Sequence, residues 1–153
     1  MFVFTQYYDE SSSSITFNDI MSIDSEDAFL RQMFKHKYST TDNGKFKYAL
    51  NPSEDGKSTS FASYYPSLKT FWFEFVRKGT VYTGTPQEKS IVVENVYDKV
   101  FNKVERRCKF VRMETDVETT YALYDCKKAK FDSYIGFTIS NSTGEITTFV
   151  KDN

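Results

Sequence analysis

The stretch TPQEKSIVVENVYDKVFNKVERR, residues 85–107, decides the fold class of this chain. It opens on Thr85-Pro86-Gln87-Glu88, which has the spacing of a capping box with proline at the first helical position. Apolar residues then recur in adjacent pairs three or four positions apart, which fits one helical stripe and breaks strand alternation. They stand at positions 92, 93, 96, 97, 100, 101 and 104. The stretch predicts a helix over residues 86–107, although valine has a low helix propensity.

After this helix the apolar period returns to two, which indicates strands. The last two of them are joined by the turn sequence Asn-Ser-Thr-Gly at residues 141–144. Four strands are predicted, over residues 108–113, 118–125, 133–140 and 145–150. The second half of the chain is therefore expected to be a helix followed by a four-strand antiparallel meander.

Before the decisive stretch, two elements have a clear signal. Ser25 is a helix cap followed by two acids, and an apolar stripe follows it, so a helix is predicted over about 25–37. Thr70–Val76 reads TFWFEFV, with three phenylalanines on one face and a mostly apolar second face, which is typical of a central strand. Weaker patterns predict strands over residues 2–8, 15–23, 45–48 and 80–83, and a polar loop over 51–60.

The composition agrees with a strand-rich globular domain. Of 153 residues, 61 are aromatic or β-branched, whereas only nine are alanine or leucine. This balance excludes disordered, collagenous, coiled-coil and Ala/Leu-rich helical classes. We expect one α+β domain spanning residues 1–153, with a large antiparallel sheet and two helices.

The two cysteines, Cys108 and Cys126, are too few for the framework of a disulfide scaffold. The N-terminal sequence MFVFTQYYDE lacks the basic and long apolar regions of a signal peptide. No apolar run approaches the ~20 residues of a transmembrane helix. We therefore expect a cytoplasmic protein with reduced thiols and no membrane partner.

The sequence gives little support for an enzyme. His36 is the single histidine, and we expect it to be a partly exposed residue at a helix C-terminus. Two cysteines and one histidine cannot complete a four-ligand zinc site, and neither a nucleophile elbow nor a dinucleotide fingerprint occurs. The alternating acids Glu114, Asp116 and Glu118 are typical of a solvated turn between strands. We predict no catalytic residue, no metal site and no cofactor.

Two features point to binding. A basic stripe runs along the predicted 86–107 helix, and tyrosines are numerous enough that some are expected at the surface, where they suit partner interfaces. The candidate binding residues are Tyr64, Tyr65, Trp72, Tyr121 and Tyr124 among the aromatics, and Lys99, Lys103 and Arg106 in the basic stripe.

We therefore expect a non-enzymatic protein-binding or inhibitor module whose partner is another protein. The composition is typical of an AT-rich coding sequence, which would fit a phage or viral accessory protein acting in the host cytoplasm. Two alternatives stay open: a nucleic-acid-binding protein that uses the basic stripe, and a small-ligand cup between the 86–107 helix and the meander. A homo-oligomer is also compatible with the sequence.

Overall fold

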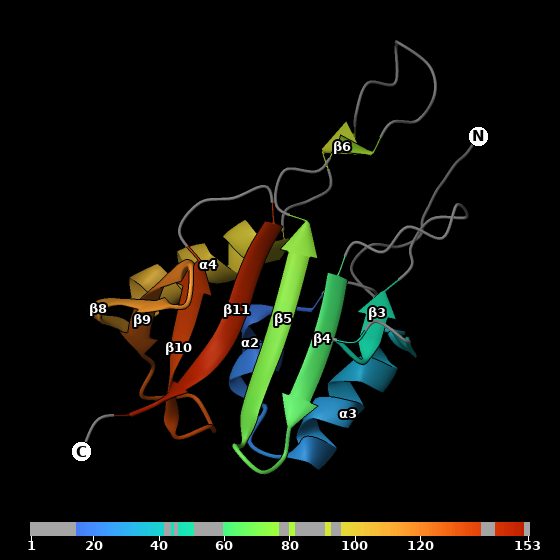
Figure 1. Ribbon diagram of the computed structural model, residues 1–153, viewed down its shortest axis with the longest axis horizontal. Coiled ribbons are helices and arrows are strands. Elements are labelled where there is room, and N and C mark those ends of the chain that lie inside the picture. Colours follow the sequence, from blue (N-terminus) through green and yellow to red (C-terminus); the bar gives the residue numbers. More distant parts are fainter. Residues whose placement is uncertain are drawn as a thin grey trace.

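The described residues of the protein form an eight-stranded antiparallel sheet with three helices packed on one face, as the computed structural model shows (Figure 1). The strand order is β2-β3-β4-β5-β11-β10-β9-β8. The structure describes residues 15–41, 44, 46–50, 60–76, 80–81, 91–92, 96–138 and 143–151. The helices are α2 (Phe17–Met21), α3 (Glu26–Lys35) and α4 (Val96–Arg107). The strands of the sheet are β2 (Ser39–Thr40), β3 (Tyr48–Leu50), β4 (Ser60–Tyr65), β5 (Thr70–Val76), β8 (Lys109–Asp116), β9 (Thr119–Asp125), β10 (Ser133–Thr138) and β11 (Thr143–Val150).

The predicted α+β class and the main elements are confirmed. The helix α4 is followed by the meander β8-β9-β10-β11, in which each strand pairs with the next. The strand β5 has the predicted bounds and lies inside the sheet between β4 and β11. In α3 the predicted cap is present, because the Ser25 hydroxyl accepts a hydrogen bond from the Ala28 amide at 3.2 Å. These are the segments in which local pattern and final packing agree.

The predicted helix over residues 86–107 is confirmed from Val96 to Arg107 and is wrong at residues 91–92, whereas residues 86–90 and 93–95 lie outside the described residues. Ile91–Val92 forms the strand β7, which pairs with β6 (Thr80–Val81) in a separate two-stranded sheet, and α4 begins at Val96. The β-branched run from Ile91 favours an extended backbone over a helix. The proposed capping box at residues 85–88 lies outside the described residues. Within α4 the apolar stripe does face the core, through Tyr97, Val100 and Val104.

A third helix replaces the strand predicted over residues 15–23. In α2 the Thr16 hydroxyl accepts a hydrogen bond from the Asp19 amide, and the Asp19 carboxylate accepts one from the Thr16 amide at 3.0 Å. This reciprocal pair satisfies orphan donors at the helix start and favours a helix over the alternation of Ile15 and Phe17. The five-residue helix buries Phe17, Ile20 and Met21 against the sheet.

The other predicted strands and the predicted polar loop are confirmed only in part. The strand predicted over 45–48 is β3, which starts only at Tyr48, and the strand predicted over 80–83 is represented by β6. Residues 2–8 and almost all of the polar loop 51–60 lie outside the described residues, and Ser60 begins β4. The strand β4 has no predicted counterpart, because its sequence SFASYY lacks a clear alternation of apolar and polar residues.

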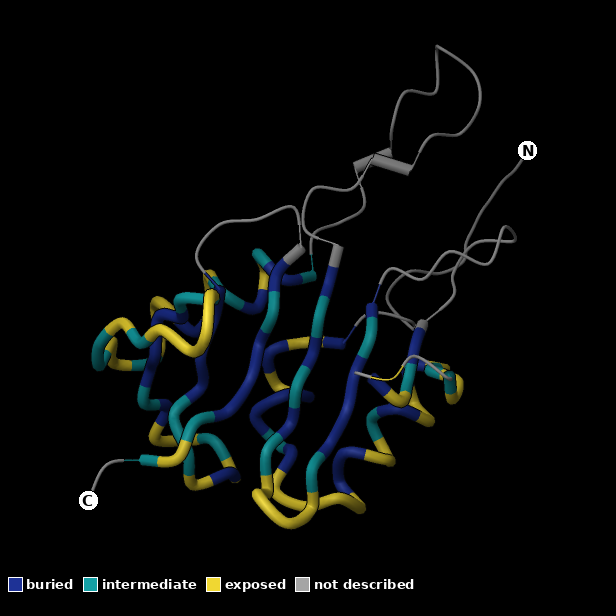
Figure 2. The backbone as a smooth tube through the Cα atoms, in the orientation of Figure 1, coloured by how far each residue is buried: buried dark blue, intermediate teal, exposed yellow. Residues whose placement is uncertain are grey.

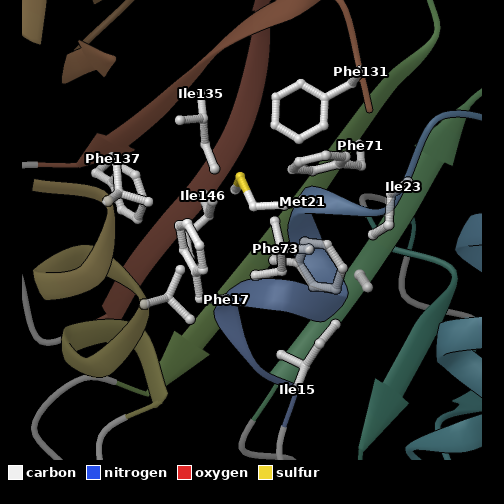
Figure 3. Close-up of a cluster of buried hydrophobic side chains, with 14 of the residues drawn as sticks. Ile15, Phe17, Met21, Ile23, Phe71, Phe73, Phe131, Ile135, Phe137 and Ile146 are labelled. Carbon is white, nitrogen blue, oxygen red and sulfur yellow. The ribbon is translucent and has the colours of Figure 1, made fainter. Parts of the chain in front are cut away.

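The core lies between the sheet and the helices. Figure 3 shows Ile15, Phe17 and Met21 from the α2 region against Phe71 and Phe73 of β5 and Ile146 of β11. Phe73 and Phe75 stack at 5.8 Å between ring centroids, and Phe71 meets Phe131 edge to face at 5.3 Å. The predicted phenylalanine face of β5 is thus the centre of the core.

The expectation of reduced thiols is contradicted. Cys108 and Cys126 form a disulfide, with their Cα atoms 4.5 Å apart. Cys108 follows the last turn of α4 and Cys126 follows the last residue of β9, so the antiparallel meander returns the second cysteine to the first. The two cysteines are 18 residues apart in the sequence, and no local pattern indicates that they meet. The pairing of β8 with β9 brings them together.

Candidate interaction surface

Among the described residues, helices cover one face of the sheet and none lies on the other face, which is called the open face here. Phe71, Phe73 and Phe75 of β5 belong to the core with residues of the helices, so Trp72 and Glu74 point to the opposite, open face. In an antiparallel sheet, residues directly opposite each other lie on the same face. The register therefore shows, strand by strand from β5 outward, which residues lie on the covered face and which lie on the open face. This assignment places the predicted binding residues on three different surfaces.

Two of the predicted tyrosines belong to the core. Tyr64 lies opposite Phe71 and packs on Phe29 at 5.5 Å, and its residue is 8% exposed. Tyr124 is 6% exposed and contacts Phe101 at 6.0 Å. Burial raises the pKa of both phenol groups above the usual value. These rings contribute packing area to the covered face of the sheet.

Tyr65, Trp72 and Tyr121 lie on the open face. Tyr121 is nevertheless buried, because it packs edge to face on Phe149 at 5.1 Å and donates a hydrogen bond from its hydroxyl to Glu145 Oε1 at 2.9 Å. Glu145 stands directly opposite Glu74. Burial and the negative charge of these carboxylates raise the pKa of Tyr121, which keeps the phenol protonated and able to donate. Aromatic side chains of the sheet itself therefore cover this part of the open face.

The predicted basic residues lie away from the sheet. Lys99, Lys103 and Arg106 are exposed on α4, as their helical spacing predicted. The disulfide adds more bases to the end of this helix, because it holds residues 107–109 close to residues 125–127. The bases that it gathers are exposed: Arg106, Arg107, Lys109, Lys127 and Lys128. The structure therefore joins two basic clusters that are about twenty residues apart in the sequence.

The space between α4 and the meander is filled by side chains. Tyr97 and Phe101 of α4 stack at 6.4 Å between centroids, and Phe101 meets Phe137 of β10 at 5.1 Å. The Tyr97 ring lies against Gly144 of β11, where a side chain would collide with it. A surface hollow of about 680 Å³ exists instead along α3, lined by Asp27, Leu30, Arg31, Gln32, Phe34 and Lys35.

Three of the seven exposed large apolar side chains of the described residues lie on the hairpin of β8 and β9, and two more, Leu30 and Phe34, lie on α3. Phe110 is 49% exposed, Met113 is 46% exposed and Val117 is 89% exposed. Figure 2 shows the contrast, with the strands in the middle of the sheet largely dark blue and β8 in teal and yellow. Large apolar side chains that stay accessible on one element are a feature of interaction sites. None of the candidate tyrosines is exposed to this extent.

The strand β8 also forms an edge of the sheet. It pairs with β9 on one side, and no described strand pairs with its other side. The opposite edge is β2, which has only two residues, whereas β8 has eight. Short edge strands protect against pairing with other chains, and long edge strands offer a row of backbone donors and acceptors.

The hairpin geometry shows which backbone groups of β8 point outward. Asp116 and Thr119 close a two-residue turn, and such a turn closes on a hydrogen-bonded pair. Hydrogen-bonded and non-hydrogen-bonded pairs alternate along an antiparallel ladder, so Thr115 opposite Thr120 is a non-bonded pair. The 3.0 Å contact between the two threonine hydroxyls fits the closer side chains of such a pair. Thr115 and Met113 therefore direct their amide and carbonyl groups away from β9.

The charged side chains of β8 share the open face. Arg112, Glu114 and Asp116 lie opposite Leu123, Tyr121 and Thr119. Arg112 Nη2 donates to Glu114 Oε1 at 2.9 Å, and the Arg112 guanidinium lies 5.6 Å from the centre of the Tyr134 ring.

The strand was predicted over residues 108–113, but its edge position was not. The acids Glu114 and Asp116 were interpreted as part of a solvated turn, which is wrong because both lie in β8; the turn comprises Val117 and Glu118. The alternation of apolar and charged residues over 110–116 is the signal that could have identified a half-exposed strand.

Other kinds of site find no support among the described residues. They contain no group of three or more histidine, cysteine or acidic side chains placed to hold a metal ion. His36 is 2% exposed, which contradicts the expected partial exposure, because its ring points inward to Asp19 at 2.9 Å. None of the described helices combines the length and the apolar character needed to span a bilayer.

Comparisons of the chain with protein-family models, with curated proteins and with solved structures gave no match.

Proposed function

We propose that this chain is a non-enzymatic protein-binding module that docks an extended segment of its partner on the outer edge of β8. The observation that carries the proposal is that Phe110 and Met113 are about half exposed on a strand whose outer side pairs with no described strand. Strand addition at a sheet edge is a common mode of peptide recognition, in which the backbone supplies affinity and alternate side chains supply specificity.

The outer edge of β8 offers both the backbone groups and the side chains that such a site needs. Met113 and Thr115 supply the outward backbone groups, as the alternation along the hairpin indicates. On the open face, Arg112 and Glu114 present one positive and one negative charge two residues apart. We therefore expect a partner segment that carries an acid opposite Arg112 and a base opposite Glu114.

The disulfide bears on the compartment in which this module acts. Disulfides persist in oxidising environments and are rare in the cytoplasm. The Cys108–Cys126 bond therefore favours an oxidising compartment over the cytoplasm that the sequence suggested.

A displayed library of random octapeptides, matched to the length of β8, tests the proposed function. The library is panned on the wild-type chain and counter-selected on Met113→Pro, which removes an outward amide and leaves the ladder with β9 intact. Met113→Ala is the matched control, because it shortens the same side chain and keeps the amide.

We expect enriched peptides to bind Met113→Pro at least about tenfold more weakly than Met113→Ala, because only the proline variant lacks the edge donor. Failure to enrich any peptide that distinguishes these two variants would remove the proposal. Circular dichroism of both variants shows that the fold is retained.

Nucleic-acid binding is a second candidate, favoured by the basic surface that the disulfide assembles. Bases that neutralise phosphates release counterions, so the affinity for DNA or RNA would fall steeply with salt. Fluorescence anisotropy of a labelled single strand at low and high salt tests this candidate. Lys127→Glu/Lys128→Glu should weaken binding, whereas Lys69→Glu, an exposed base outside the basic surface, should not. An unchanged anisotropy of DNA and RNA at low salt would exclude it.

A further inference from the structure

We infer that the segment which docks on β8 is the β8 strand of a second copy of this chain, related to the first by a two-fold axis. The inference rests on the proposed function, because it uses the same edge and names its partner. It starts from the order of charges in the strand, which reads KFVRMETD over Lys109–Asp116. Both bases stand in the first half and both acids in the second half, so an antiparallel copy brings opposite charges together.

The backbone restricts how two copies of β8 can pair. Because Met113 and Thr115 direct their amide and carbonyl groups outward, the hydrogen-bonded pairs between the copies must join these residues. A β-bulge at Val111 interrupts the regular strand on one side and the turn ends it on the other. Three registers remain: Met113 opposite Met113, Met113 opposite Thr115, and Thr115 opposite Thr115.

The side chains select one of these registers. With Met113 on the two-fold axis, Arg112 stands opposite the partner's Glu114, and the symmetry repeats this attractive pair. With Met113 opposite the partner's Thr115, Arg112 faces the partner's Asp116 twice, but Glu114 stands directly opposite the partner's Glu114. With Thr115 on the axis, Glu114 faces the partner's Asp116 twice. Like charges directly opposite are destabilising in a sheet, so only the first register is free of such a contact.

The contacts within one copy already suit this arrangement. Arg112 and Glu114 lie side by side on the open face, with 2.9 Å between Nη2 and Oε1. In the two-fold pair each Glu114 would lie between its own Arg112 and the partner's Arg112, which makes a network of four alternating charges. On the other face, Met113 is half exposed and would meet the partner's Met113 on the axis. The backbone hydrogen bonds, the charges and the apolar contacts therefore all favour the register with Met113 opposite the partner's Met113.

Charge reversal tests the register directly. Sedimentation velocity of the wild-type chain from about 1 to about 200 µM should show a reversible monomer–dimer equilibrium. Arg112→Glu and Glu114→Arg should each raise the dissociation constant at least about tenfold, because each sets like charges opposite in both pairs. The double variant R112E/E114R should restore the dimer. An equimolar mixture of the two single variants should form a heterodimer.

Lys69→Glu, a charge reversal at an exposed base in the turn between β4 and β5, should leave the dissociation constant unchanged. A wild-type chain that stays monomeric over the whole range would overturn the inference. So would single reversals without effect, or a double variant that does not recover. A monomeric chain that still enriches edge-dependent octapeptides would remove self-pairing and keep the proposed function, whereas a monomer that enriches none would remove both. If the single variants and the double variant have equal thermal midpoints, a raised dissociation constant does not result from a loss of folding.

Discussion

His36 Nε2 lies 2.9 Å from Asp19 Oδ2, and this buried pair joins the C-terminal cap of α3 to the first turn of α2. The same carboxylate accepts hydrogen bonds from the Thr16 amide at 3.0 Å and from Lys35 Nζ at 3.1 Å. One aspartate therefore starts one helix and holds the end of the next. Its loss should loosen both helices.

Asp19→Asn should lower the free energy of unfolding near neutral pH by about 1–3 kcal/mol, because charged hydrogen bonds to a mostly buried group are lost. Burial alone would raise the pKa of Asp19, but hydrogen bonds from Lys35 and Thr16 and the His36 charge hold it below its usual 3.8. Folding therefore favours the ionised form. Its contribution to stability is complete well above pH 3.8 and is lost as the pH falls below that value.

Urea unfolding of the wild type and Asp19→Asn between pH 7 and pH 2.5 checks this expectation. The difference between the two proteins should shrink as the wild-type carboxyl becomes protonated. Asp24→Asn, an exposed acid in the connection between α2 and α3, is the control and should change little. A difference that stays constant over the whole range would mean that the charge of Asp19 does not stabilise the fold.

Reduction of the disulfide should lower the free energy of unfolding by about 3 kcal/mol, the value expected for a closed loop of this size. Guanidinium unfolding with and without a reductant measures the change. The variant C108S/C126S has no bond to lose, so the reductant should leave its midpoint unchanged. A thiol assay of the unfolded, unreduced wild type should find no free thiol. Two free thiols in that assay would contradict the bond.

Gly136→Ala should destabilise the protein by about 1–3 kcal/mol through overpacking. A Cβ atom at this position on β10 would lie 2.6 Å from the Phe149 ring and 2.8 Å from a methyl group of Leu123. Both neighbours would have to move. Gly44→Ala is the control, since nothing lies within 4 Å of its Cβ position, and its effect should stay within about 0.5 kcal/mol. Equal thermal midpoints for the two variants would show that the Phe149 ring yields at no cost.

The sequence predicts those elements whose local pattern coincides with their final environment. The strand β5 was identified with its bounds because its two mostly apolar faces reflect burial inside the sheet. The caps of α3 were readable because Ser25 and the acids after it act within one helical turn. The helix α2 was missed because its capping box spans only Thr16 and Asp19, and the apolar alternation beside it imitates a strand.

The candidate surface could not be derived in the same way. That β8 lies at an edge follows from the order of eight strands, which depends on contacts between distant segments such as β5 and β11. The pairing of Cys108 with Cys126 follows from the return of β9 along β8. Sequence reasoning placed the binding residues on tyrosines because they are numerous, whereas packing buries Tyr64, Tyr121 and Tyr124.

Val117→Gly should stabilise the protein. Val117 has a φ of 58° at the first central position of the β8–β9 turn, where a two-residue hairpin prefers glycine. A β-branched residue in this region carries strain of about 1–3 kcal/mol, whereas glycine costs about 0.5–1 kcal/mol in additional chain entropy. The strain is the larger quantity, and the valine side chain, 89% exposed, buries little that glycine would lose.

A net gain of about 1 kcal/mol corresponds to a rise of about 2–4 °C in the thermal midpoint of a domain of this size. Val150→Gly is the matched control, because Val150 is also an exposed valine but has a negative φ in β11. It should lower the midpoint, since glycine weakens a strand and relieves no strain there. If both variants lowered the midpoint, the left-handed backbone at Val117 would carry no strain. Because the substitution leaves Arg112 to Thr115 unchanged, it should preserve the edge on which the proposed dimer depends.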